Sequence, residues 1–277
     1  MMVATETNTD RPLAGRRIVL TRAAGKNTDL AARIAAAGGL PFIFPTIATV
    51  PVADDHIIRE ALAQLDRYSF IVFTSAEAVE HLTRLLPTLP HGGDQLRYAA
   101  VGSATAEALQ IHGIHDVLVP DDFRAEGLIA LFTKIAIELK QARATAPAKR
   151  PKVLIPRALI AREVLPQALE QLGFDVTVAP LYETVMPDVR LIDVRRLVVD
   201  AKLACDAVVF MSPSAAKNFV ELISRAGADG VKLLAEVDCY SIGAPTTAAL
   251  RKLGISGERV HQAAEATAES VFTALIG

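Results

Sequence analysis

The chain has 277 residues, of which 51% are hydrophobic and 22% are charged. This length is sufficient for one large or two medium-sized globular domains. The 29 lysine and arginine residues nearly balance the 31 aspartate and glutamate residues, and the formal net charge is -2. A near-neutral chain has no overall attraction to nucleic acid or to an anionic membrane, so we expect neither partner, and any basic site must be local.

Two further features bear on where the protein works. Residues 1–12 carry acids and threonines where a signal peptide has a basic start and an apolar run, and no stretch has the length of a membrane helix. Cys205 and Cys239 lie far apart and belong to no CxxC motif, which argues against a disulfide framework and against a structural zinc site. We therefore expect a cytoplasmic protein that binds no metal.

The two halves of the chain repeat each other. Residues 17–22 match residues 152–157, and the match continues without gaps as far as Thr49 and Thr184. Further matches pair 71–75 with 208–212, 101–105 with 242–246, and 125–126 with 268–269. The offset between matched positions grows only in small steps, which indicates an ancestral duplication followed by insertions in loops.

Each half alternates short β-branched runs with helical stretches of ten or more residues. This alternation is typical of parallel strands joined by helical crossovers. It predicts an α/β protein with two doubly wound, flavodoxin-like, parallel-sheet domains. Residues 141–152 are polar, rich in alanine and marked by proline, and we expect an exposed connector there.

Two partitions of the chain into domains fit the repeat. A cut in the connector gives two sequential domains. Alternatively, the chain crosses from one domain to the other and back through residues 45–51 and 180–187, which are bounded by prolines and equivalent under the repeat. The residue pattern alone does not choose between these partitions.

Small polar residues follow the predicted strands, where open parallel sheets bind anions at helix N-termini. The candidate binding residues of this kind are Thr74, Ser75, Ser103, Thr105, Ser212, Ser214, Thr246 and Thr247. Any one of them, taken alone, is better explained as an ordinary helix cap or turn residue. Four motifs in two symmetric pairs favour a shared anion-binding cleft.

Basic residues occur at the same strand ends. Arg22 and Arg157 occupy matching positions, where a guanidinium can bind a carboxylate through two hydrogen bonds. Lys217, Arg124 and Arg162 lie near such ends or loops and are candidates for additional positive charge. Each of these residues, considered alone, is more often simply solvated.

Several motifs of other chemistries are absent. Leu20 stands where a phosphate-binding GxxxxGK[ST] loop has its first glycine, and the GxGxxG, GxSxG and HExxH patterns do not occur. The sequence therefore contains no motif for hydrolytic, metal or dinucleotide chemistry.

Six short motifs together resemble the uroporphyrinogen-III synthase family from about Leu13 onwards. They are residues 72–79, 100–106, 162–169, 181–184, 210–214 and 242–248. Each motif is only moderately specific, whereas their order and spacing together are highly specific. The resemblance implies two α/β domains joined by a two-stranded hinge, with a cleft between them. It selects the crossed partition, with residues 1–46 and 184–277 in domain one and residues 47–183 in domain two.

The resemblance also implies a reaction. The family is one of cofactor-independent enzymes of heme biosynthesis that close the linear tetrapyrrole hydroxymethylbilane to uroporphyrinogen III, with loss of water and inversion of the last pyrrole ring. The substrate carries eight carboxylates, which suit a cleft of helix N-termini and hydroxyl groups. We expect this small molecule to be the partner, and the protein to be a monomer.

Loss of the substrate's hydroxyl requires one proton donor, and Tyr182 is the candidate general acid among the matched positions. The repeat places Tyr182 opposite Ile47, so only one of the two crossings carries a phenol. A phenol is a weak acid, and a hinge tyrosine can equally pack with its hydroxyl bonded to the backbone. A carboxyl group of the substrate is the other candidate acid.

Two other functions are alternatives to this enzyme activity. One is a catalytically silent module of the same fold that binds tetrapyrroles or other anions. The other, a sugar-phosphate enzyme on a duplicated α/β scaffold, rests on analogy of fold alone. The matched polar motifs are intact and the chain has no additional helix-turn-helix region for signalling, which favours the enzyme over the silent module.

Overall fold

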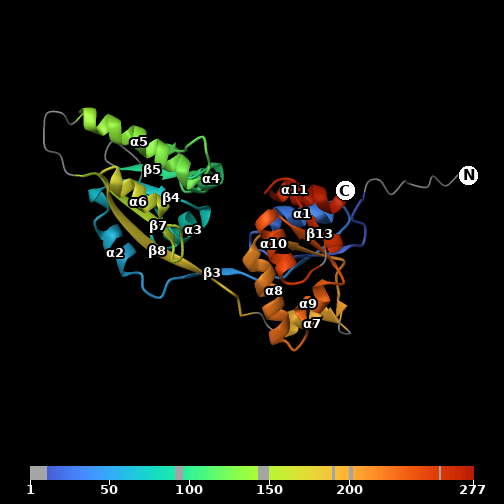
Figure 1. Ribbon diagram of the computed structural model, residues 1–277. Coiled ribbons are helices and arrows are strands. Elements are labelled where there is room, and N and C mark those ends of the chain that lie inside the picture. Colours follow the sequence, from blue (N-terminus) through green and yellow to red (C-terminus); the bar gives the residue numbers. More distant parts are fainter. Residues whose placement is uncertain (1–10, 91–95, 143–149, 189–190, 200–201, 256) are drawn as a thin grey trace, which may run out of the picture. The chain divides into compact units, whose positions relative to one another are not determined.

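The computed structural model describes residues 11–90, 96–142, 150–188, 191–199, 202–255 and 257–277. The chain folds into two compact units (Figure 1). Unit 1 consists of Met1–Thr49 and Val185–Gly277, and unit 2 consists of Val50–Thr184. Within the described ranges, no helix combines the length and the apolar character needed to cross a membrane.

Unit 1 contains one parallel sheet with the strand order β13-β12-β11-β1-β2. Its strands are β1 (Arg17–Leu20), β2 (Leu40–Ile43), β11 (Ala207–Phe210), β12 (Asp238–Ser241) and β13 (Val260–Gln262). Its helices are α1 (Thr28–Ala36), α7 (Leu191–Leu197), α8 (Pro213–Arg225), α9 (Gly230–Leu234), α10 (Ala244–Lys252) and α11 (Ala268–Ile276). A separate antiparallel ribbon joins β9 (Val198–Val199) to β10 (Lys202–Leu203).

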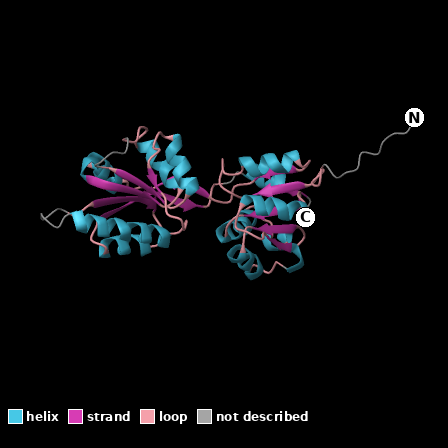
Figure 2. Ribbon diagram, turned by 90° about the horizontal axis from the view of Figure 1, so that it is seen from above, coloured by secondary structure: helices cyan, strands magenta, loops and turns pink. Residues whose placement is uncertain are grey.

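Unit 2 contains a six-stranded sheet with the order β3-β8-β7-β4-β5-β6. Its strands are β3 (Ala48–Pro51), β4 (Tyr68–Phe73), β5 (Arg97–Ala100), β6 (Val117–Leu118), β7 (Lys152–Ala158) and β8 (Asp175–Val185). Its helices are α2 (His56–Ala63), α3 (Ala76–Leu85), α4 (Ser103–Ile111), α5 (Ala125–Ala142) and α6 (Val164–Gln171). Figure 2 shows that helices cover both faces of the strands in each unit.

The two sheets repeat one topology. The repeat matches β1, β2, β11, β12 and β13 with β7, β8, β4, β5 and β6, and these strands occur in the same spatial order in both sheets. That order is 2-1-3-4-5, the flavodoxin-like arrangement, when the strands are numbered along the chain in unit 1 and their matches in unit 2 take the same numbers. In unit 2 the chain reaches these strands in the permuted order β4, β5, β6, β7, β8. The predicted α/β class with two doubly wound parallel sheets is therefore confirmed.

Each sheet buries a core on both faces, because successive side chains of a strand point in opposite directions. In β4, Ile71 and Phe73 pack with α2, α3 and α4, whereas Phe70 and Val72 pack with α5 and α6. The Phe70 ring meets the edge of Phe132 at a centroid distance of 5.2 Å. In unit 1, α1 and α11 cover one face, and α7, α8, α9 and α10 cover the other.

The two proline-bounded crossings form neighbouring strands. Residues 45–51 contain β3, residues 180–187 contain the end of β8, and β3 is the neighbour of β8 in the sheet. Beyond β3, the Val52 N–H donates to the Leu181 carbonyl oxygen at 3.1 Å. The expected connector 141–152 begins within α5 and ends at β7, and its residues 143–149 lie outside the described part of the chain.

Candidate active site

The clearest candidate site in unit 2 is a cavity at the carboxyl ends of β4, β5 and β7. The chain runs from β7 to β8 in one direction across the sheet and from β4 to β5 in the other, so its topological switch point lies between β7 and β4. The cavity has a volume of about 360 Å³. It is lined by Thr74, Val101, Arg124, Ala125, Glu126, Ile155, Arg157, Ala161, Arg162, Leu165 and Pro166.

Arg157 is the buried charge of this cavity. It lies near the end of a strand whose preceding residues are almost all buried, and only 7% of its own surface is exposed. Its Nη1 donates to the carbonyl oxygen of Arg162 at 2.9 Å, and its Nη2 forms an ion pair with Glu163. Its Nε is buried and has no hydrogen-bond partner among the described residues. An unmet guanidinium N–H of this kind requires an explanation, and a ligand acceptor that reaches it when a neighbouring side chain moves would supply one.

Two more guanidiniums stand at the same cavity. Arg162 is exposed on the loop after β7, and Arg124 is exposed just before α5. Arg124 donates to both carboxylate oxygens of Asp122, at 2.8 and 3.0 Å. This hydrogen-bonded pair lowers the pKa of Asp122 and raises the pKa of Arg124, so both groups stay charged over the ordinary pH range. Three guanidiniums and the Glu126 carboxylate line the cavity, while Asp122 and Glu163 each pair with one of these guanidiniums. An anionic ligand therefore finds guanidiniums to bind but competes with carboxylates of the protein.

The structure brings two predicted site residues into direct contact. The Tyr182 hydroxyl lies 3.0 Å from Ser75 Oγ, which also accepts the Ala78 N–H as the N-cap of α3. The Tyr182 ring stacks on His81 at a centroid distance of 4.7 Å, and 7% of the residue is exposed. No sequence motif indicated the contact with His81. The role of Tyr182 as a general acid stays a prediction.

The remaining candidates of unit 2 lie at the start of α4. Ser103 is exposed on the first residue of the helix, and Thr105 is buried, with 4% of its surface exposed. Gly102 caps the helix in an extended conformation and offers no side chain. A side chain as deeply buried as that of Thr105 contributes to helix packing whatever else it does.

In unit 1, Arg22 and Ser212 lie at the ends of adjacent strands. Arg22 is half-buried after β1, and its carbonyl oxygen accepts Asn27 Nδ2 at 3.0 Å. Ser212 is the N-cap of α8: its Oγ accepts the Ala215 N–H at 3.2 Å and lies 3.0 Å from the Oγ of the exposed Ser214. Lys217 is exposed on the same helix. Because β1 and β11 are paired, these groups share one edge of the sheet.

The two threonines of α10 are buried, with 1% of Thr246 and 4% of Thr247 exposed. Thr247 Oγ1 lies 2.6 Å from Ser241 Oγ and donates to Gln262 Oε1 at 2.8 Å. These bonds tie α10 to β12 and β13. A hydroxyl that is engaged in this way has a structural task, and its proposed contact with substrate stays a prediction.

Sequence reasoning missed Glu163 as the partner of Arg157. It lies within a motif that carries the family resemblance, but β7 ends at Ala158, so the segment between Arg157 and Glu163 is mostly loop and has neither helical nor strand periodicity. A loop contact of this kind has no sequence signal. It is found only once the path of residues 159–163 is known.

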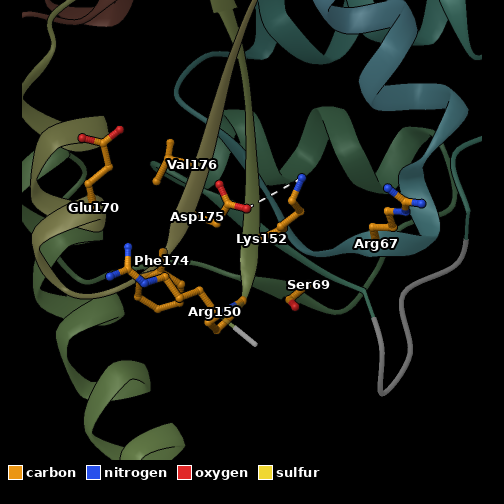
Figure 3. Close-up of a pocket in the computed structure, with 9 residues that line it drawn as sticks. Arg67, Ser69, Arg150, Lys152, Glu170, Phe174, Asp175 and Val176 are labelled. Carbon is orange, nitrogen blue, oxygen red and sulfur yellow. Dashed lines mark ion pairs between the residues drawn. The ribbon is translucent and has the colours of Figure 1, made fainter. Parts of the chain in front are cut away.

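A larger cavity of unit 2, of about 1110 Å³, lies at the opposite, amino ends of β4, β7 and β8 (Figure 3). Arg67, Arg150 and Lys152 line it together with Glu170 and Asp175. Lys152 and Asp175, which are partners on the neighbouring strands β7 and β8, form an ion pair at 3.7 Å in its lining. Ligands of doubly wound sheets bind at the carboxyl ends of strands, so this cavity is set apart from the candidate site by its place in the fold.

The fold defines an α/β protein built by duplication of a doubly wound sheet. The profile of the family described as uroporphyrinogen-III synthase HemD matches residues 28–273. A uroporphyrinogen-III synthase of Synechococcus elongatus is 29% identical over 252 residues, which are 88% of this chain and 89% of that protein. That of Chlorobaculum parvum is 29% identical over 219 residues, covering 77% of this chain and 79% of that protein.

The crystal structure of the uroporphyrinogen-III synthetase of Helicobacter pylori has the same fold. It aligns with a TM-score of 0.58 at 19% identity and covers 93% of this chain and 97% of its own. The chain belongs to the uroporphyrinogen-III synthase family, as the match over most of its length shows. The expected resemblance is confirmed.

Proposed function

We propose that this chain closes hydroxymethylbilane to uroporphyrinogen III, with loss of water and inversion of the last pyrrole ring. The observation that carries this proposal is the family match across residues 28–273, which spans both units. No finding favours the alternative of a catalytically silent binding module. We also propose that the protein works as a cytoplasmic monomer and without a cofactor.

Recognition of the substrate rests on its carboxylates. Guanidiniums bind them through paired hydrogen bonds, and the free N–H groups at helix N-termini add partial positive charge. Such groups follow β4, β5 and β7 in unit 2, and β1, β11 and β12 in unit 1. We propose that both sets act on one substrate in a cleft, so that the two ends of a flexible chain are brought together. Proximity of this kind lowers the barrier without a strong nucleophile.

The chemical step needs a proton. The carbon–oxygen bond of the terminal hydroxymethyl group breaks, the hydroxyl leaves as water with one added proton, and the pyrrole nitrogen stabilises the cation that remains. Tyr182 is our candidate for the donor, and its contact with Ser75 Oγ supports that choice because a hydroxyl network can supply and relay a proton. Ring closure later releases one proton, so the balance is restored.

The test is a product assay on the purified full chain. Freshly made hydroxymethylbilane is supplied, the products are oxidised, and the two uroporphyrin isomers are separated. Spontaneous closure gives the non-inverted isomer, so formation of the inverted isomer at a rate proportional to protein concentration is the expected result. Binding of the substrate with only the non-inverted isomer formed would overturn the proposal in favour of the silent module.

A further inference from the structure

We propose that the Arg157 pocket, defined here as the unit 2 cavity lined by Thr74, Arg124, Arg157 and Arg162, binds one carboxylate arm of the tetrapyrrole. We further propose that the Glu163 carboxylate occupies Arg157 until that arm arrives. The assignment rests on the proposed function for the identity of the ligand. It names a binding group and an internal competitor within one unit.

The first support is the incomplete hydrogen bonding of Arg157. The side chain is more than nine-tenths buried, yet its Nε has no partner among the described residues. A guanidinium has five donors, and an unmet donor in the interior carries an energetic cost. A carboxylate entering the cavity could satisfy this N–H together with one Nη group in the fork geometry that arginine favours.

The second support is the character of Glu163. The Glu163 side chain is 54% exposed, whereas the Arg157 side chain is 8% exposed. The carboxylate can therefore rotate into water while the guanidinium stays in place. Glu163 is the N-cap residue of α6, but its side chain makes no capping hydrogen bond. This carboxylate therefore does not serve as a hydrogen-bonding cap of the helix. Its contact with Arg157 is the arrangement expected of a protein carboxylate that occupies the guanidinium until a ligand carboxylate displaces it.

The third support is the size of the Arg157 pocket. Its volume of about 360 Å³ lies near the lower end of the range of roughly 300–1,000 Å³ for small-molecule sites. A tetrapyrrole is too large for this space, but one pyrrole with its acidic arms is not. The pocket is therefore a subsite for part of the substrate.

The fourth support is the exposed apolar surface on the two segments that flank the pocket, which are the loop before α5 and the loop after β7 with the first residue of α6. Phe123, next to Arg124, is 57% exposed. Leu159, Ile160 and Val164, on either side of the lining residues 161–162, are 48%, 90% and 49% exposed. Exposed apolar groups beside guanidiniums fit a ligand that joins a flat apolar ring to carboxylates, and they fit inorganic anions less well.

The test is binding of uroporphyrin III, the stable oxidised form of the product, followed by its fluorescence with the full chain. Glu163→Gln removes the competing carboxylate, and we expect it to tighten binding by about tenfold. Arg157→Lys keeps the charge but loses the fork, and we expect it to weaken binding by about tenfold. Glu221→Gln, which breaks the exposed Glu221–Arg225 pair of α8, is the matched control and should bind as the wild type does.

Thermal unfolding separates this proposal from a purely structural ion pair. Without ligand, Glu163→Gln should unfold at a lower temperature than wild type, because Arg157 is left buried and unpaired. Saturating uroporphyrin should raise its unfolding temperature by more than it raises that of wild type. Unchanged or weaker binding by a folded Glu163→Gln variant would overturn the proposal.

Two comparisons identify the source of any failure. Binding of uroporphyrin is measured without turnover, so it does not depend on enzyme activity. If Glu163→Gln binds more tightly but the wild-type protein makes no inverted isomer, the proposed subsite is supported and the proposed enzyme activity is wrong. Inorganic phosphate at the same free concentration should not displace uroporphyrin. If phosphate displaces uroporphyrin from the wild type but not from Arg157→Lys, the pocket is a general anion site, and its assignment to a carboxylate arm is overturned.

Discussion

The hydroxyl oxygen of Tyr182 lies 3.0 Å from Oγ of Ser75, although 107 residues separate them in the chain. Ser75 Oγ already accepts the Ala78 N–H, so its own proton remains to be donated. The phenol at the end of β8 is thereby linked to the N-terminus of α3. This link connects the candidate acid to the carboxyl ends of the strands, where we propose that the substrate's carboxylates bind.

The first prediction concerns Tyr182→Phe, which removes only the hydroxyl. If Tyr182 acts as general acid, we expect kcat to fall by about 10²-fold, with KM and the unfolding temperature near those of wild type. The assay must follow the isomer ratio as well as the loss of substrate. Tyr240→Phe is the matched control, because Tyr240 is equally buried and stacks on His261 at the same centroid distance of 4.7 Å.

A Tyr182→Phe variant that makes the inverted isomer at the wild-type rate would exclude Tyr182 as an essential acid. The substrate's own carboxyl groups would then be the candidates. A smaller loss of rate, shared between kcat and KM, is the result expected of a residue that only positions the substrate.

The second prediction concerns Thr105 and Thr246, which occupy matching positions on α4 and α10. A hydrogen bond from a hydroxyl to a charged group contributes roughly 1.5–3 kcal/mol, so Thr105→Ala and Thr246→Ala should each weaken binding of uroporphyrin by about tenfold or more. Both side chains are buried, so alanine also removes a packed methyl group. Thr→Ser at each position keeps the hydroxyl and is the control.

Isothermal titration beside thermal unfolding decides the outcome for the two threonines. We expect serine to keep most of the affinity that alanine loses. Wild-type affinity in both alanine variants would remove these residues from the binding site and leave them a packing role only.

The third prediction concerns Gly127, in the first turn of α5. A Cβ at this position would lie 1.9 Å from the carbonyl oxygen of Asp122, which is the residue that pairs with Arg124. Gly127→Ala must therefore displace the loop that carries Arg124 to the Arg157 pocket. We expect a loss of about 1–3 kcal/mol in the free energy of unfolding, together with weaker binding of uroporphyrin.

Urea denaturation measures the stability of this variant. Gly257→Ala is the control, because a Cβ at Gly257 would meet nothing within 4 Å and its backbone is not left-handed. Equal stability of Gly127→Ala and the control would show that the loop accommodates the methyl group and would contradict the prediction.

The fourth prediction concerns the two cysteines. Burial raises the pKa of Cys239 to about 12, and burial with the nearby Asp206 carboxylate raises the pKa of Cys205 to about 12. The reactive thiolate is therefore scarce at pH 8, and we expect iodoacetamide to label the native protein about 10³-fold more slowly than the urea-unfolded chain. Mass spectrometry over time gives both rates.

The same shifts set the sign of the pH dependence of stability. The unfolded thiols lose their protons near pH 9, whereas the folded thiols keep them up to about pH 12. The folded state therefore binds more protons in this window, and the free energy of unfolding should fall as the pH rises through it. Native labelling at the rate of a free thiol would contradict both expectations.

The α/β class and the duplication were determined by the sequence itself. Strand and helix periodicities are local properties. The gapless match from residues 17–49 to residues 152–184, together with the shorter matches further along the chain, shows which strands correspond. Neighbouring strands in a parallel sheet end at the same edge, so the carboxyl-end position of the candidate residues also followed from the pattern. The order of strands in the two sheets agrees with this derivation.

Only the tertiary structure distinguished residues that the repeat makes equivalent. Arg22 and Arg157 match in sequence, yet Arg22 is half-buried beside a loop closed by Asn27, whereas Arg157 is buried against Glu163. Likewise, the contact between Tyr182 and Ser75 depends on how β8 and α3 pack. Burial and long-range hydrogen bonds are decided by the side chains that surround a residue in space, and neighbours along the chain do not determine them.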